Sequence, residues 1–189
     1  EQAPYALAVA SKIVEAVNRG LDTVVSTASH TLAANVENLV LSGAAKISGT
    51  GNALANRIDG STNSAANMLA GRGGNDVYVV GAGDRIIEAA NGGTDTVLSS
   101  QVSLNLGAFA NVENARLLGK AALNVAGNAL NNVIFGNDAK NTISGGAGND
   151  FINGGLGNDI LVGGAGKDAF VFNTTLSAAT NVDTIFMYN

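Results

Sequence analysis

Aspartate recurs at every ninth residue near the C-terminal end of the sequence, at Asp150, Asp159 and Asp168. Each aspartate follows a glycine-rich stretch that reads GGAGN, GGLGN or GGAGK. Carboxylate and carbonyl oxygens are the ligands that hard cations prefer, and Ca²⁺ takes about six to eight of them. A glycine turn exposes its carbonyls without an obstructing Cβ atom. The spacing therefore predicts Ca²⁺ sites that two stacked turns share, because one turn offers too few oxygens.

These aspartates belong to a nine-residue repeat that runs without a break over 127–171. Its first residue is always glycine, and its sixth residues are Asn132, Asn141, Asp150, Asp159 and Asp168. Its eighth residues are Ile134, Ile143, Ile152, Leu161 and Phe170. The last three positions alternate as a short strand whose eighth residue points inward. Because nine residues cannot fold alone, stacked copies must bury a continuous column of side chains, which predicts an all-β solenoid.

A longer unit contains these repeats and occurs twice, at offsets of 73 to 76 residues. IVEAVNRGLDTVVS (13–26) aligns with IIEAANGGTDTVLS (86–99), and Tyr5 aligns with Tyr78 and Phe170. The chain starts and stops inside this pattern, so we expect a fragment of a longer protein. Three segments follow: spacer repeats over 1–126 that include one near-match at 71–79, regular repeats over 127–171, and a further spacer or truncated end over 172–189.

Composition excludes several classes of protein. The net charge of −5 argues against nucleic-acid binding, which needs basic patches. The absence of cysteine excludes disulfides and thiolate zinc sites. No apolar run is long enough to span a membrane. With a single histidine, His30, and no nucleophile paired with a base, we expect this chain not to be an enzyme.

The nonapeptides resemble the RTX (repeats-in-toxin, hemolysin-type) calcium-binding repeat, G-G-x-G-x-D-x-U-x. Residues 145–153, 154–162 and 163–171 match every fixed position, whereas 71–79 departs once, at Arg72. The resemblance implies a parallel β-roll with two nonapeptides per coil and Ca²⁺ between successive turns on each edge. It also implies secretion by a type I system.

Two nonapeptides per coil would stack Asp168 on Asp150 in a site with two carboxylates. Asp159 would stack on Asn141, and Asp150 on Asn132, in weaker sites with one carboxylate each. A further site around Asp76 is also expected. The metal-binding residues predicted from the turns are Gly145, Gly146, Ala147, Gly148, Asp150, Gly154, Gly155, Leu156, Gly157, Asp159, Gly163, Gly164, Ala165, Gly166 and Asp168, together with Asn132, Asn141 and Asp76.

Other recurring residues have structural interpretations. Asp22, Asp95 and Asp183 precede equivalent Thr-Val or Thr-Ile pairs, which favours turn capping, with an additional Ca²⁺ role as the alternative. The seventh and ninth repeat positions should point outward. On one side they form an apolar face that we expect to pack on earlier repeats or on a missing domain: Val133, Phe135, Phe151, Asn153, Ala169 and Val171.

The sequence therefore predicts a module that binds several Ca²⁺ ions and folds outside the cell, in a secreted or cell-surface bacterial protein. One alternative is the C-terminal module of a secreted RTX enzyme of the protease, lipase or epimerase type. Another is a segment of an RTX adhesin or surface-layer protein, whose partner would be a cell-surface component. The sequence beyond this chain would distinguish them, since hydrolase motifs favour the enzyme and further repeats favour the adhesin.

Overall fold

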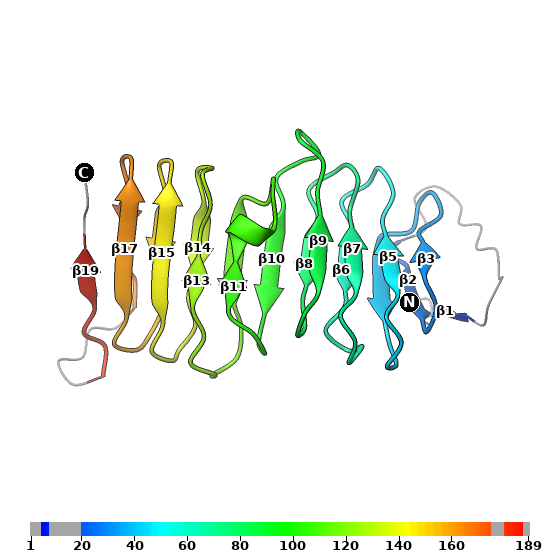
Figure 1. Ribbon diagram of the computed structural model, residues 1–189, viewed down its shortest axis with the longest axis horizontal. Coiled ribbons are helices and arrows are strands. Elements are labelled where there is room, and N and C mark those ends of the chain that lie inside the picture. The colour runs from blue at the N-terminus through cyan, green and yellow to red at the C-terminus, as the bar shows by residue number, and fades with distance from the viewer. Residues whose placement is uncertain (1–4, 8–19, 175–179, 187–189) are drawn as a thin grey trace. The chain divides into compact units, whose positions relative to one another are not determined.

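The computed structural model describes residues 5–7, 20–174 and 180–186, and the chain is a parallel β-solenoid of about eight turns (Figure 1). Short strands alternate with tight turns, and strands one coil apart pair in parallel. The predicted all-β solenoid is thereby confirmed. The chain divides into two compact units, Glu1–Thr96 and Val97–Asn189. The regular repeats at 127–171 lie inside the second unit, while their boundaries as a domain stay a prediction.

The first unit contains two parallel sheets. One sheet has the order β1 (Tyr5–Leu7), β2 (Thr23–Ser26), β4 (Asn38–Leu41), β6 (Arg57–Asp59) and β8 (Val77–Val79). The other has the order β3 (His30–Thr31), β5 (Ser48–Thr50), β7 (Met68–Ala70) and β9 (Arg85–Ile87). From β2 onward, successive strands of one sheet are joined through a strand of the other, so the chain coils.

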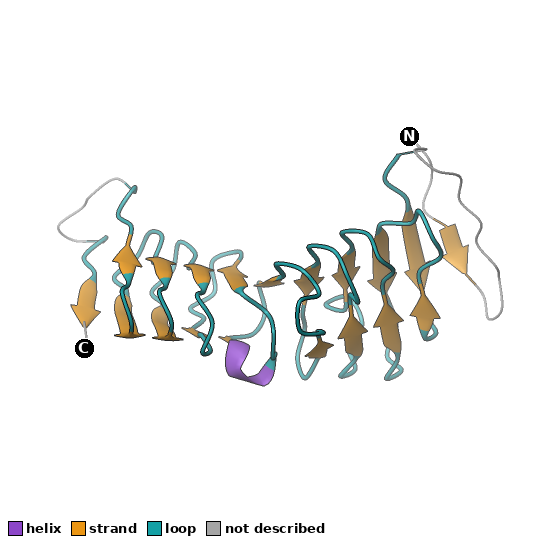
Figure 2. Cartoon of the chain, turned by 90° about the horizontal axis from the view of Figure 1, so that it is seen from above, coloured by secondary structure: helices purple, strands orange, loops and turns teal. Residues whose placement is uncertain are grey.

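The second unit repeats this arrangement, and its first strand begins at the last residue of the first unit. One sheet has the order β10 (Thr96–Ser99), β12 (Asn114–Leu117), β14 (Val133–Phe135), β16 (Phe151–Asn153) and β18 (Ala169–Phe170). The other has β11 (Leu104–Asn105), β13 (Val125–Ala126), β15 (Thr142–Ala147), β17 (Ile160–Ala165) and β19 (Thr184–Phe186). The short 3-10 helix η1 (Leu106–Ala108) follows β11 (Figure 2). Of the predicted final segment, residues 175–179 and 187–189 lie outside the described residues.

The core of the second unit is the column of eighth-position side chains. Ile134 pairs with Ile152 in one sheet and Ile143 with Leu161 in the other, and all four are fully buried. Each buried aliphatic side chain contributes about 1.5–3 kcal/mol relative to an exposed one. Phe170, at the end of the column, is only half-buried.

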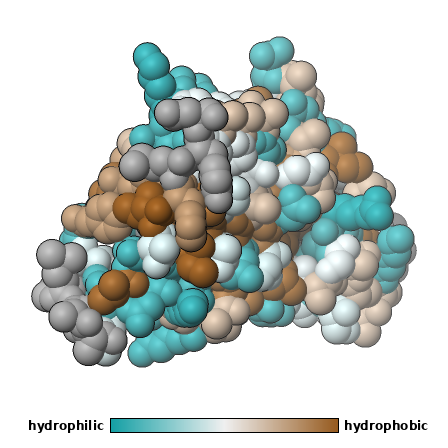
Figure 3. Space-filling model, turned by 60° about the vertical axis from the view of Figure 1, so that its left-hand side comes forward, coloured by the Kyte–Doolittle hydropathy of each residue, from teal (hydrophilic) through white to brown (hydrophobic). Residues whose placement is uncertain are grey.

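The predicted apolar face differs from the expectation in two ways. Val133 and Phe135 are 37% and 36% exposed, so the described residues of earlier coils cover them only in part, with Arg116 of β12 over the Phe135 ring (6.0 Å to its centroid). Apolar and polar surface alternate on the side of the molecule in Figure 3. Asn153, expected to point outward, is buried because its amide donates to Asn173 Oδ1 (2.9 Å) and its oxygen accepts from Gly155 N (3.0 Å). These two bonds pull the side chain into the turn that follows β16.

Candidate metal centres

The sixth-position residues of the regular repeats stack in two columns, one before each set of strands. The backbone N–H of Asn132 donates to Asp150 Oδ1 (2.8 Å), and that of Asp150 donates to Asp168 Oδ1 (3.0 Å). In the other column, the N–H of Asn141 donates to Asp159 Oδ1 (2.8 Å). The structure therefore brings together every pair that the sequence placed at a shared site. Ion binding by these pairs stays a prediction.

The second column continues to a residue that the sequence did not place there. The N–H of Asp159 donates to Asp183 Oδ1 (3.0 Å), although the two residues are 24 positions apart. The longer separation hid Asp183 from a nine-residue period. Its NVDTI context, which matches that of Asp95, was the available signal.

One oxygen of each of the two buried aspartates in the regular repeats is left without a donor among the described residues. Asp150 and Asp159 are 2% and 1% exposed, and the Oδ2 atom of each has no hydrogen-bond partner among the residues that the structure describes. A buried acceptor without a partner costs about 1–3 kcal/mol, and more when it is charged. A cation beside Oδ2 would remove this cost. The donor set thus fits a hard metal ion.

Burial also disfavours the charged form of these carboxylates. Desolvation raises the pKa of Asp159 to about 6, with a smaller contribution from Asp183 and a partial offset from the Asn141 N–H. Desolvation likewise raises the pKa of Asp150, and the neighbouring Asp168 adds to this rise. Without a counter-ion, the turns therefore hold protons more tightly than exposed aspartates do.

The first-position glycines leave room for these carboxylates. A Cβ atom added to Gly145 would collide with Asp150 Oδ2, and one added to Gly154 would collide with Asp159 Oδ2. Gly157 is required for another reason, since its φ of +117° lies in the left-handed region and a Cβ would come within 2.8 Å of Ala139 O. The glycines thus serve the position of the carboxylate as well as the shape of the turn.

The remaining predicted turn residues do not all lie in turns, because β15 and β17 continue through the first three positions of their following repeats. Gly146 pairs with Gly164, and Ala147 with Ala165, in the extended ends of β15 and β17. The Ala165 carbonyl accepts from Gly148 N (2.9 Å). Leu156 lies at a turn and is 39% exposed. Gly155 O accepts from Thr174 Oγ1 (3.2 Å). Gly163 lies in β17, and Gly166 directly follows that strand with a φ of +131°. Their role as carbonyl ligands stays a prediction.

Asn132 and Asn141 stack as predicted, but both ends of each side-chain amide form hydrogen bonds within the protein. The side-chain oxygens accept from Asn128 N and Asn137 N (both 2.9 Å), which closes each asparagine's own turn. The amide nitrogens donate to Glu113 O (2.9 Å) and Leu123 O (2.7 Å) of the preceding coil. An asparagine amide thus supplies the donors that an aspartate turn lacks.

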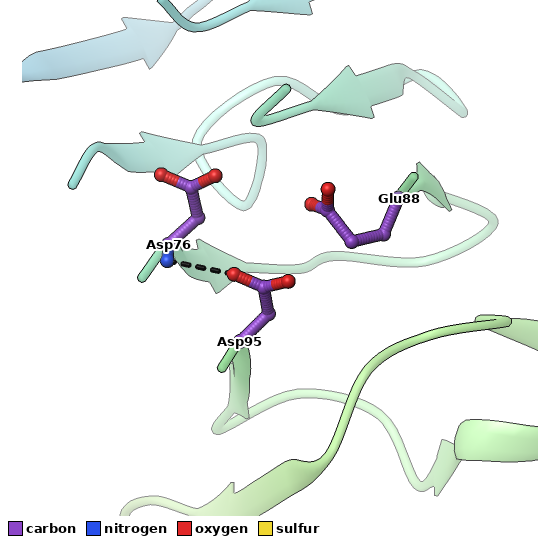
Figure 4. A group of neighbouring side chains, drawn as sticks. All are labelled: Asp76, Glu88 and Asp95. Atoms are coloured by element: carbon purple, nitrogen blue, oxygen red, sulfur yellow. Dashed lines mark hydrogen bonds between the residues drawn. The ribbon is translucent and has the colours of Figure 1, made fainter. Parts of the chain in front are cut away.

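The first unit holds a third acidic arrangement, around Asp76 (Figure 4). Asp76 Oδ1 accepts from Asn56 N (2.7 Å), and Asp76 N donates to Asp95 Oδ1 (2.8 Å). Glu88 completes a buried group in which one oxygen of each carboxylate lies within 4.8 Å of the others. Desolvation, followed by the charges of Asp95 and Glu88, raises the pKa of Asp76 to about 7. The sequence predicts a site at Asp76 and favours Asp95 as a turn cap, with a Ca²⁺ role as the alternative. No role was predicted for Glu88, although the aligned spacer segments both contain a glutamate at this place.

The chain matches the family model of the RTX calcium-binding nonapeptide repeat, in four copies, over residues 50–87, 126–161 and 135–170. No curated protein matches the chain. Within the described part of the chain, no helix is long and apolar enough to cross a membrane. The matched ranges contain Asp76, Asp150, Asp159 and Asp168, the aspartates at sixth positions of the glycine-rich turns.

Proposed function

We propose that this chain, which contains RTX calcium-binding nonapeptide repeats, is a structural module whose folding is completed by Ca²⁺. The observation that carries the proposal is the pair of buried, unpartnered Oδ2 atoms on Asp150 and Asp159. Each lies at a glycine-rich turn, whose backbone carbonyls would be the further oxygen ligands. Ca²⁺ is preferred over softer ions because the donor set consists of oxygen alone.

The residues that would hold the ions follow from the two columns. Asp150 and Asp168 would contribute to one site, and Asp159 and Asp183 to another, with backbone carbonyls from the same turns. When bound, Ca²⁺ supplies the positive charge that lets both carboxylates ionise. The aspartates themselves fix the stacking distance, since Oδ1 of each accepts the N–H of the coil before it.

Calcium concentration would then control folding. An ion that binds only the folded chain stabilises it by about 1.4 kcal/mol when its concentration is ten times Kd. Several such sites together decide whether a small domain folds, because domain stabilities are only about 5–15 kcal/mol. Extracellular Ca²⁺ modules have Kd values near 10⁻⁴–10⁻³ M, so the module would remain unfolded at cytosolic concentrations.

This behaviour suits a secreted or cell-surface bacterial protein that leaves the cell by type I secretion before it folds. The module has no catalytic role of its own in this proposal. It would serve either as the tail of a secreted enzyme or as part of an adhesin or surface layer. The apolar residues Val133 and Phe135, which are exposed, suit contact with another part of the parent protein.

Ion counting tests the proposal. Equilibrium dialysis with ⁴⁵Ca²⁺ should show several ions bound per chain, and Asp150→Ala/Asp159→Ala/Asp168→Ala should lose most of them. Asp138→Ala is the matched control, because Asp138 is an exposed aspartate of the same repeats. Equal binding by the triple variant and the control would refute the assignment.

A further inference from the structure

Three carboxylates meet inside the first unit, outside the regular repeats. Asp76, Glu88 and Asp95 are 1%, 7% and 0% exposed. One oxygen of each lies within 4.8 Å of the others, and the side chains converge in Figure 4. Glu88 and Asp95 lie beyond the range 50–87 that matches the nonapeptide family. This acidic cluster therefore needs an explanation besides the repeat motif.

Asp76 directs an unpartnered oxygen into the cluster. Its Oδ1 atom accepts from Asn56 N, while Oδ2 has no hydrogen-bond partner among the described residues. A Cβ atom added to Gly71 would meet both Asp76 Oδ2 and the hydroxyl oxygen of Tyr78. That hydroxyl donates to Glu88 Oε2. The free oxygen of Asp76 therefore lies on the side of the carboxylate that faces Glu88.

Backbone and hydroxyl groups are among the donors that hold these carboxylates. Asp95 Oδ1 accepts from Asp76 N, and Glu88 Oε1 accepts from Ala89 N (2.9 Å). Backbone and hydroxyl donors hold an oxygen in place without cancelling its charge. Two backbone oxygens, Arg72 O and Ala89 O, and Glu88 Oε1 all lie around Gly92, within 3.1 Å of the position of a Cβ there. Ala89 O also accepts from Gly92 N (3.0 Å). The buried group of carboxylate oxygens, with one oxygen of Asp76 unpartnered, is the kind of donor set that a hard cation binds.

We propose that Asp76, Glu88 and Asp95 form a distinct Ca²⁺ site that closes the loop between β9 and β10 onto β8. Tyr78 is its positioning residue, because the phenol orients Glu88. The choice of Ca²⁺ rests on the proposed function, but the ligand set differs from that of the nonapeptide columns. Three carboxylates from three places in the chain would join the repeat turn to the spacer that follows it.

The sequence repeats this set as a unit. Tyr5, Glu15 and Asp22 have the same spacing as Tyr78, Glu88 and Asp95. Where phenylalanine replaces the tyrosine, at Phe170, no glutamate occurs between it and Asp183. The phenol and the glutamate therefore occur together or not at all, as expected if the hydroxyl exists to hold the carboxylate. Glu15 lies outside the described residues.

Tyrosine-sensitised Tb³⁺ luminescence tests the site directly. The chain has three tyrosines and no tryptophan, so Tyr5→Phe/Tyr188→Phe leaves Tyr78 as the sole sensitiser. Tb³⁺ replaces Ca²⁺ at oxygen sites, and energy transfer requires an ion close to the phenol. We expect strong emission that Ca²⁺ displaces. Glu88→Gln in this background should weaken Tb³⁺ binding by about tenfold or more, since ligand charge sets affinity.

Two control variants separate this proposal from the general one. Asp84→Asn alters another buried aspartate of the same unit, whose Oδ1 accepts from Asn67 N and whose Oδ2 accepts from Gly81 N. It should leave the Tyr78-sensitised emission unchanged. Asp150→Ala/Asp168→Ala should reduce ⁴⁵Ca²⁺ binding while preserving the emission. Absent emission together with normal ⁴⁵Ca²⁺ binding would overturn the cluster site and leave the proposed function standing. Absent emission together with absent ⁴⁵Ca²⁺ binding would overturn both.

Discussion

The backbone N–H of Asp150 donates to Oδ1 of Asp168, 18 residues later, at 3.0 Å. The two carboxylate oxygens of a repeat aspartate therefore have different partners. Oδ1 holds the adjacent coil, and Oδ2 faces the turn, as Oδ2 of Asp150 does without a partner. A carboxylate can therefore contact the neighbouring coil and bind an ion at once. An asparagine at the same position uses its side-chain oxygen to close its own turn.

Replacement of Asp159 by asparagine should lower the number of ions that folding requires. The new amide nitrogen can donate to the preceding coil as Asn141 Nδ2 does to Leu123 O, so a neutral contact replaces a carboxylate oxygen that needs a cation. The slope of folding free energy against the logarithm of free Ca²⁺ reports the ions taken up, and we expect it to fall for Asp159→Asn. Asp159→Ala should instead raise the Ca²⁺ midpoint, because it removes the bond to Asn141 N. Identical titrations for the two variants would contradict this account.

Alanine at Gly154 should weaken both folding and Ca²⁺ affinity. The added Cβ would occupy the place of Asp159 Oδ2, and the carboxylate would have to move away from its turn. A Ca²⁺ folding titration should give a midpoint several-fold higher than that of the parent chain. Gly73→Ala serves as the control, because its Cβ would meet only Gly92 O at 3.8 Å and its φ is not in the left-handed region. A larger effect at Gly73 than at Gly154 would refute the argument.

Protonation of the buried carboxylates at low pH should partly replace Ca²⁺ in stabilising the folded chain. Desolvation raises the pKa of Asp76 to about 7 and that of Asp159 to about 6, above the ordinary 3.8. A group whose pKa is higher in the folded state stabilises that state at low pH, and this contribution is lost as pH rises through the folded pKa. In EDTA, β-structure measured by circular dichroism should therefore increase between pH 8 and pH 5. Asp76→Asn/Asp159→Asn should flatten that dependence. A parent chain whose β-structure falls over this range would contradict the sign.

The core column makes a prediction that is independent of metal. Ile152→Ala should lower the free energy of unfolding in saturating Ca²⁺ by about 2–5 kcal/mol, because a fully buried side chain leaves a cavity. Phe170→Ala should cost less, since Phe170 is half-buried at the end of its column. Urea unfolding of both variants measures the difference. The reverse order would mean that β18 carries more of the packing than its burial indicates.

The fold followed from periodicity because a strict repeat imposes the same burial and pairing on every copy. The stacking of Asp150 on Asn132 and of Asp159 on Asn141 needed only the repeat length and two repeats per coil. The direction in which each side chain points was harder to predict from the sequence. Whether the oxygen of Asn132 faces an ion or Asn128 N depends on the local turn, which residue type alone does not decide.

The nine-residue repeat could not predict the contacts of Glu88 and Asp183. Each joins its cluster through a connection of irregular length, and the contact depends on how that connection folds back. Glu88 reaches Tyr78 across ten residues, and Asp183 reaches Asp159 across 24. For Glu88, the sequence did contain a signal, because two copies of the long unit share the same spacing of tyrosine, glutamate and aspartate.

The central claim is that Ca²⁺ at the aspartate turns drives folding. Its most direct test is far-ultraviolet circular dichroism during a Ca²⁺ titration of the EDTA-treated chain, beside Asp150→Ala/Asp159→Ala/Asp168→Ala. We predict a transition from coil to β-structure near millimolar Ca²⁺ that the triple variant loses. Spectra that Ca²⁺ leaves unchanged, or a triple variant that folds at the same Ca²⁺ concentration as the parent, would contradict the account.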